Sequence, residues 1–78
     1  MARYEVYVTY KEGVFDPPGA MAERVLANLG FGGVNSVSVG KFIEIDADAD
    51  IESVRKMCDQ LLANPVIEDY RIIVAGEA

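Results

Sequence analysis

The chain has 78 residues, of which 51% are hydrophobic, and a formal charge of −6 from 13 acidic and 7 basic residues. A chain of this length forms a single domain, residues 1–78, and buries only roughly 60–65% of its extended surface. The one cysteine, Cys58, excludes an intrachain disulfide, and the sequence contains no histidine that could serve as a zinc ligand. We therefore expect oligomerisation to supply part of the stability.

The acidic charge also restricts the classes of partner. An acidic surface repels nucleic-acid phosphates and anionic membranes, so we expect neither as a ligand. No apolar run approaches the roughly 20 residues that a membrane span requires, and the first residues show no signal-peptide pattern. The expected compartment is the cytoplasm.

The first half of the chain predicts a strand followed by a helix. Residues 3–11 alternate between two faces and are rich in β-formers, which is typical of a strand. A rigid loop follows, in which Asp16 is a suitable helix N-cap because Pro17 at the first helical position loses no needed N–H. Apolar residues then recur at helical spacing over residues 17–29, and Gly30 can close the helix.

The second half predicts two strands, a helix and a last strand. Residues 34–39 and 41–46 alternate again and are close enough to form a hairpin or a bent ribbon. A helix is expected from about residue 50 to 63, where an Asn-Pro pair ends it, and a strand over 67–74. The apolar stripe of this helix consists of Ile51, Val54, Cys58, Leu61 and Leu62.

The order β-α-β-β-α-β predicts an α+β fold of the ferredoxin-like type. It consists of a four-stranded antiparallel sheet with two helices on one face. The other face is left uncovered, and Tyr7, Phe42 and Ile73 are expected to point there. We interpret these three residues as a self-association patch, although scattered apolar surface residues are also common.

No motif in the chain predicts an independent active site. Residues 46–50 resemble the start of a calcium loop, but Ile51 and Met57 occupy the places of the required glycine and glutamate. Gly40-Lys41 lacks the rest of a phosphate loop. Cys58 lies on the apolar stripe of its helix, which indicates a core residue rather than a nucleophile. We expect no catalytic, cofactor-binding or metal-binding residues in this chain.

Three stretches of the sequence resemble one protein family. The first is Lys11–Gly19 (KEGVFDPPG), the second Val37–Ile45 (VSVGKFIEI), and the third and most specific Cys58–Tyr70, which contains LLANPVIEDY. Together they resemble the PurS family, the small subunits of phosphoribosylformylglycinamidine (FGAM) synthase. The resemblance extends over essentially the whole chain.

The resemblance implies a role in an ATP- and glutamine-dependent C–N ligase of purine biosynthesis. It implies a cytoplasmic, non-catalytic subunit that forms dimers or tetramers and bridges two partners. One partner is the large synthetase subunit, which binds ATP, magnesium and formylglycinamide ribonucleotide. The other is the glutaminase subunit, which releases the ammonia that this nucleotide receives. A bridging subunit contributes by positioning its partners.

The stretches that carry the resemblance also contain the candidate contacts with these partners. Each candidate has a structural alternative, which is turn chemistry in the loop and cross-strand pairing in the sheet. The candidates are Asp16, Pro17, Gly19, Lys41, Asp69, Tyr70 and Arg71.

Two other functions fit the predicted topology. A small-molecule-sensing regulatory domain is the main alternative, because paired βαββαβ sheets can bind amino acids or nucleotides. Titration of the isolated chain with glutamine, ATP and glycine would distinguish it. An acylphosphatase-like enzyme would require an anion-binding loop with arginine after the first strand, where this chain has Glu12-Gly13-Val14.

Overall fold

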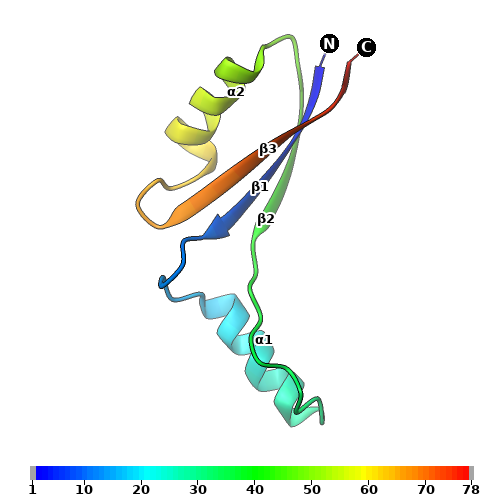
Figure 1. Ribbon diagram of the computed structural model, residues 1–78, viewed down its shortest axis with the longest axis vertical. Coiled ribbons are helices and arrows are strands. Elements are labelled where there is room, and N and C mark those ends of the chain that lie inside the picture. The colour runs from blue at the N-terminus through cyan, green and yellow to red at the C-terminus, as the bar shows by residue number, and fades with distance from the viewer. Residues whose placement is uncertain (1, 78) are drawn as a thin grey trace.

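Over residues 2–77, the sheet has three strands rather than the four that we expected. A computed structural model describes residues 2–77, with the strands β1 (Ala2–Tyr10), β2 (Lys41–Ala47) and β3 (Glu68–Glu77). Their order is β2-β1-β3, and β1 is antiparallel to both neighbours (Figure 1). The predicted period of two in the first strand is confirmed.

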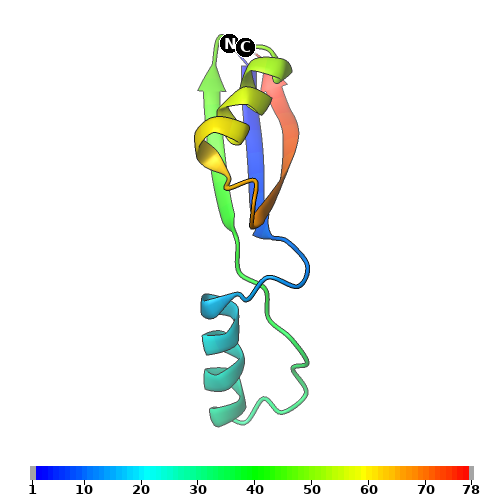
Figure 2. The same cartoon turned by 90° about the vertical axis from the view of Figure 1, so that its left-hand side faces the viewer.

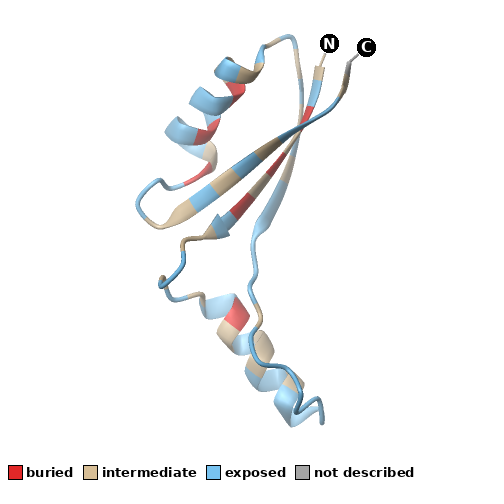
Figure 3. Cartoon of the chain, in the orientation of Figure 1, coloured by how far each residue is buried: buried red, intermediate tan, exposed pale blue. Residues whose placement is uncertain are grey.

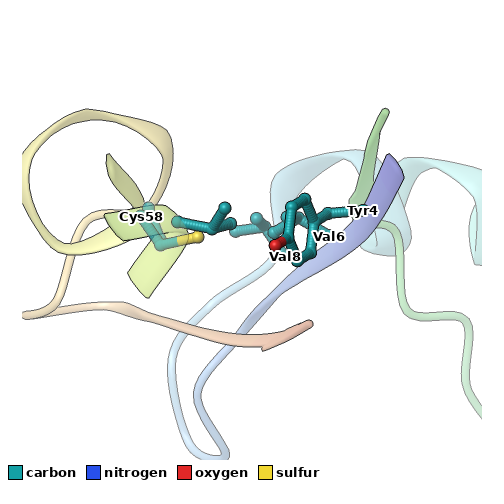
Figure 4. Close-up of a cluster of buried hydrophobic side chains, with 6 residues drawn as sticks. Tyr4, Val6, Val8 and Cys58 are labelled. Carbon is teal, nitrogen blue, oxygen red and sulfur yellow. The ribbon is translucent and has the colours of Figure 1, made fainter. Parts of the chain in front are cut away.

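One face of β1 forms the core together with the second helix. Tyr4, Val6 and Val8 point to this face and are buried against Val54 and Cys58 (Figure 4). The Tyr4 hydroxyl donates a hydrogen bond to the carbonyl oxygen of Ala49 at 2.6 Å, which satisfies the polar end of a buried ring. The alternation of β1 therefore decides which of its side chains are buried.

The second helix begins and ends close to the predicted residues but changes its period near the end. It consists of α2 (Ile51–Met57) and a π-helical turn, η1 (Cys58–Leu62). The amide of Ala63 donates to the Cys58 carbonyl oxygen five residues earlier, at 3.0 Å, and this wider turn carries the apolar stripe from Cys58 to Ala63. Leu61 is consequently 82% exposed, so its assignment to the stripe was wrong.

The first helix, α1 (Pro17–Asn28), has the predicted limits but not the predicted position. Asp16 is its N-cap, and Gly30 takes a positive φ of 101° just after it, as the sequence indicates. The helix projects away from the sheet instead of covering it (Figures 1 and 2). The expectation of two helices on one sheet face is therefore wrong, because within residues 2–77 only α2 packs there.

The segment 34–39 is extended but is not a strand of the sheet. It runs back alongside α1 and continues directly into β2, so the predicted hairpin is also wrong (Figure 1). A strand requires a backbone ladder, and no other strand of the described chain lies beside this segment.

These elements divide the molecule into two regions along its 47 Å length. We call residues 2–11 and 41–77 the body, and residues 12–40 the arm. Nearly all buried residues belong to the body, and Gly19 is the buried residue of the arm (Figure 3).

Candidate protein-interaction surfaces

A row of three side chains crosses the sheet face that α2 leaves open. The strand register places Tyr7 between Phe42 on β2 and Arg71 on β3. The Tyr7 and Phe42 ring centroids are 5.1 Å apart with a tilt of 38°, and the Arg71 guanidinium carbon lies 5.0 Å from the Tyr7 ring centroid. Aromatic and cation–π contacts therefore order this row, although Phe42 stays 52% exposed. An ordered, accessible row of this kind suits contact with another protein.

The next row along the sheet combines an apolar residue with two carboxylates. Ile73 lies opposite Glu5, and Glu5 lies opposite Glu44 on the other side. The structure thus places the three predicted patch residues, Tyr7, Phe42 and Ile73, on one face, and their part in self-association stays a prediction. Like charges on adjacent strands repel each other, so this end of the face favours a partner with basic groups.

The structure separates the three consecutive candidates at the start of β3. Asp69 and Arg71 belong to the open face, and the Asp69 carboxylate pairs with the Lys11 ammonium at 2.5 Å. Tyr70 belongs to the helix side, where its hydroxyl donates to a carboxylate oxygen of Asp59 at 3.0 Å. Burial, followed by the hydrogen bond and the charge of Asp59, raises the pKa of Tyr70. One partner surface therefore cannot contact all three side chains in this arrangement.

The features that could suggest chemistry have structural explanations. Cys58 is fully buried, and burial together with the nearby Asp59 raises the pKa of its thiol, which disfavours the nucleophilic thiolate. Asp50 caps α2, and the hydrogen bond from the Ser53 amide, at 2.9 Å, lowers the pKa of that carboxyl group. Over residues 2–77 no three His, Cys, Asp or Glu side chains are grouped to hold a metal ion.

Shallow cavities of about 220, 190 and 200 Å³ lie in the body, and the first of them reaches the base of the arm. All three are below the roughly 300–1,000 Å³ of typical ligand sites. Lys41 lines the largest one, and its ammonium group is 3.4 Å from the Leu62 carbonyl oxygen. Within residues 2–77, neither helix has the length and apolar character that spanning a bilayer requires.

Asp16 fixes the base of the arm. One of its carboxylate oxygens accepts a hydrogen bond from the Gly19 amide at 3.0 Å, and the other accepts one from the Val39 amide at 2.8 Å. A side chain at Gly19 would collide with the Val37 carbonyl oxygen, so α1 and the returning segment approach more closely than other residues permit. The predicted candidates Asp16 and Gly19, with Pro17 at the first turn of α1, shape this junction.

The arm carries an apolar surface that our sequence analysis did not identify. The predicted fold places the first helix against the sheet, where its apolar side chains would be covered, but several of them are exposed. The short length of the chain was the available signal, because a small domain rarely exposes so many large apolar residues unless they contact a partner. The exposed ones are Phe15, Met21, Val25, Leu29, Phe31, Val34 and Val39.

Comparisons of the sequence and of the structure with known proteins identify the same family. Residues 3–76 match the family model described as PurS, phosphoribosylformylglycinamidine (FGAM) synthase. The PurS subunit of Bacillus subtilis FGAM synthase is 42% identical over 76 residues, which cover 91% of this chain and 89% of that protein.

Solved structures agree over the arm as well as the body. Methanocaldococcus jannaschii PurS, one of the subunits of formylglycinamide ribonucleotide amidotransferase in the purine biosynthetic pathway, is 39% identical and has a TM-score of 0.87 over 100% of both chains. A chain of the Thermotoga maritima PurLQS structure is 31% identical, with a TM-score of 0.74 over 94% of this chain and 95% of that one. Because the arm is included in these matches, its projecting position is shared with solved relatives, and this chain belongs to the PurS family.

Proposed function

We propose that this chain is a non-catalytic bridging subunit of FGAM synthase, the ATP- and glutamine-dependent ligase of purine biosynthesis. It joins the large synthetase subunit to the glutaminase subunit, so that ammonia released from glutamine reaches formylglycinamide ribonucleotide. The observation that carries the proposal is the match, over nearly the whole chain, to a chain of a PurLQS structure.

The accessible surfaces of the molecule support a role in binding proteins. The open sheet face offers an ordered row built on Tyr7, Phe42 and Arg71, while the arm offers an apolar helix. We propose that Asp69 and Arg71, on the open face, contact a partner subunit. Asp16, Pro17, Gly19 and Lys41 then act at the base of the arm, where they set its position relative to the body.

The chemistry of the complex requires positioning rather than a nucleophile in this chain. Ammonia is lost to water unless the site that makes it and the site that uses it stay in fixed relation. We assign ATP and magnesium to the synthetase subunit and glutamine hydrolysis to the glutaminase, in a cytoplasmic complex. The buried thiol of Cys58, with its raised pKa, is consistent with this division of roles.

Reconstitution with both partner subunits tests the proposal. Glutamine-dependent FGAM formation is expected to require this chain, whereas turnover with ammonium chloride in place of glutamine depends on it much less, because free ammonia needs no bridge. Undiminished glutamine-dependent turnover without the chain would contradict the bridging role.

Charge-reversal variants show whether the open face takes part. Arg71→Glu reverses the charge in the ordered row and is expected to weaken complex formation. Lys56→Glu makes the same change at an exposed position of α2 and serves as the control. Equal binding by the two variants would remove Arg71 from the partner surface.

A further inference from the structure

The open face of the sheet carries two carboxylates whose charges are not compensated within the chain. Glu5 on β1 and Glu44 on β2 lie directly opposite each other in the strand register. Neither carboxylate forms an ion pair or accepts a hydrogen bond from any of residues 2–77. Like charges on neighbouring strands repel each other, so this pair opposes folding of the free chain. A feature that opposes folding and has no counterpart in the chain indicates a surface that another molecule completes.

The cations of the same face already have contacts of their own. The Arg71 guanidinium lies over the Tyr7 ring, and the Lys11 ammonium pairs with the Asp69 carboxylate. Arg3 lies opposite an aspartate of β2 rather than beside the two glutamates. A second copy of this chain could supply a cation from its own open face only by giving up one of these positions, and its charge of −6 opposes the approach. The missing positive charge is therefore expected from a different protein.

The aromatic row beside the glutamates indicates which kind of cation fits. Arg71 is stacked on Tyr7 with 5.0 Å between the guanidinium carbon and the ring centroid. Phe42 is 52% exposed, and no cation of the described chain lies over its ring. A guanidinium stacks on an aromatic ring more readily than an ammonium does, because it is planar and more weakly hydrated. Phe42 therefore offers a second stacking position, equivalent to the one that Arg71 occupies on Tyr7.

The geometry of the sheet brings the ring and both carboxylates within reach of one side chain. Phe42 and Glu44 are two residues apart on β2, so they share a face at a spacing of about 7 Å. Glu5 faces Glu44 across the strands at about 5 Å between Cβ atoms. A guanidinium carries five N–H donors in a flat fork, so it can stack on the ring and donate hydrogen bonds to the carboxylates at the same time.

A shallow cavity of about 200 Å³ adjoins the two glutamates. Its charged lining residues are three acids, Glu5, Glu44 and Asp46, and one base, Arg3. This excess of negative charge attracts a cation. The cavity is smaller than the sites that hold whole metabolites, so it suits a single side chain of a protein better than a free ligand.

We propose that the open face docks onto a partner protein through an arginine of that partner. The guanidinium stacks on Phe42 and donates hydrogen bonds to Glu5 and Glu44, which removes the repulsion between these carboxylates. Ile73, on the other side of Glu5, adds an apolar contact at the edge of the site. The inference rests on the proposed function, because the partner is one of the two subunits that the chain joins, and it adds the chemistry by which that subunit is recognised.

A substitution of Glu44 should affect folding and binding in opposite directions. In the free chain, Glu44→Gln relieves a repulsion, so the chain stays folded and is not destabilised. In the complex it removes a charged acceptor, and the dissociation constant is expected to rise about tenfold. Glu52→Gln makes the same change at an exposed position of α2, on the opposite side of the sheet, and serves as the matched control. A purely structural role of Glu44 would not weaken binding while stability is preserved.

Titration with each purified partner subunit in turn tests the proposal. Glu44→Gln is expected to bind one subunit about tenfold more weakly than the wild type and to bind the other equally well. Phe42→Leu keeps an apolar side chain but loses the ring, and it should weaken the same interaction about threefold. Equal dissociation constants of Glu44→Gln and the wild type for both subunits would overturn the proposal. So would a change confined to self-association, measured by sedimentation, because it would assign the open face to a second copy.

Competition with free amino acids tests the guanidinium itself. Arginine is expected to weaken binding of the wild type more than lysine does at the same concentration, and this difference should disappear in Glu44→Gln. Equal competition by the two amino acids would contradict recognition of a guanidinium. The titrations also separate this inference from the proposed function. If neither subunit binds the wild type, both fail, whereas equal binding by the wild type and Glu44→Gln removes only the arginine contact.

Discussion

The body and the arm place the same kinds of side chain in opposite surroundings. Val54 and Cys58 of the body are fully buried, whereas Leu29 and Phe31 of the arm are 67% and 56% exposed. Both regions have apolar residues at helical spacing, so the sequence pattern does not distinguish them. The difference shows that the body builds a core within one chain, whereas the arm leaves its large apolar side chains exposed.

The arm is nevertheless locally well defined. Its helix has an Asp16 cap, proline at the first turn and Gly30 beyond the end, and these local signals are sufficient to set its limits. A helix of 12 residues is marginal in water without packing. The junction at Asp16 and a covering surface are therefore both expected to contribute to its stability.

The largest effect is expected in the core of the body. Val54→Ala removes two buried methyl groups and should lower the free energy of unfolding by about 2 kcal/mol. Leu61→Ala, in the same helical region, should change it by less than about 0.5 kcal/mol, because Leu61 is exposed beside the π-helical turn. Urea denaturation of the two variants measures this contrast, and similar losses would mean that the π-helical turn does not redirect the stripe.

A smaller effect is expected at the junction that fixes the arm. Asp16→Ala removes the N-cap of α1 and the bond to the Val39 amide, which should cost about 1 kcal/mol and speed hydrogen exchange at Val39. Asp69→Ala breaks an exposed ion pair with Lys11 and should cost less than about 0.5 kcal/mol. Unchanged exchange at Val39 in the first variant would show that Asp16 does not hold the arm.

The open face of the body should respond more weakly than the core. Phe42→Ala removes the ring that contacts Tyr7 and should cost about 0.5–1 kcal/mol. Glu44→Ala, one pair further along the same face of β2, should cost nothing or stabilise slightly, since it relieves the repulsion with Glu5. Urea denaturation of both variants, at a protein concentration that keeps the oligomeric state constant, measures this difference in the free energy of unfolding. A larger loss of stability for Glu44→Ala than for Phe42→Ala would contradict this account of the open face.

The smallest effect is expected at the cap of α2 and depends on pH. The folded pKa of Asp50 is lowered from 3.8, first by the hydrogen bond from Ser53, so its contribution to stability is present above about pH 4. That contribution is lost as the pH falls through the folded value. Asp50→Asn keeps a capping side chain but cannot titrate there, so its stability should decrease less between pH 5 and pH 2 than that of the wild type. An equal decrease in the stability of the wild type and of Asp50→Asn over this pH range would exclude this role for Asp50.

The sequence correctly predicted structural features that depend on residues close together along the chain. The alternation of β1 predicted which side chains enter the core, and the Asp16 and Gly30 signals predicted the limits of α1. The placement of Tyr7, Phe42 and Ile73 on one sheet face followed from the same period of two. The contribution of these residues to binding stays a prediction.

The sequence did not predict features that depend on a change of helical period or on contacts between distant segments. The regular helical spacing placed Leu61 in the core, whereas the π-helical turn after Cys58 leaves it exposed. Whether Asp16 would cap only its own helix or also bind Val39 depends on the path of the returning chain, 23 residues later.

The sequence by itself determined three of the four predicted strands, the approximate limits of both helices, which side chains of β1 are buried, and the membership of the PurS family. Only the tertiary structure decided that α1 and residues 34–39 leave the body as an arm. The physical reason is that an apolar stripe favours burial of one helix face, but does not specify which surface covers that face. That choice depends on the direction in which residues 11–16 and Gly40 lead the chain away from the sheet.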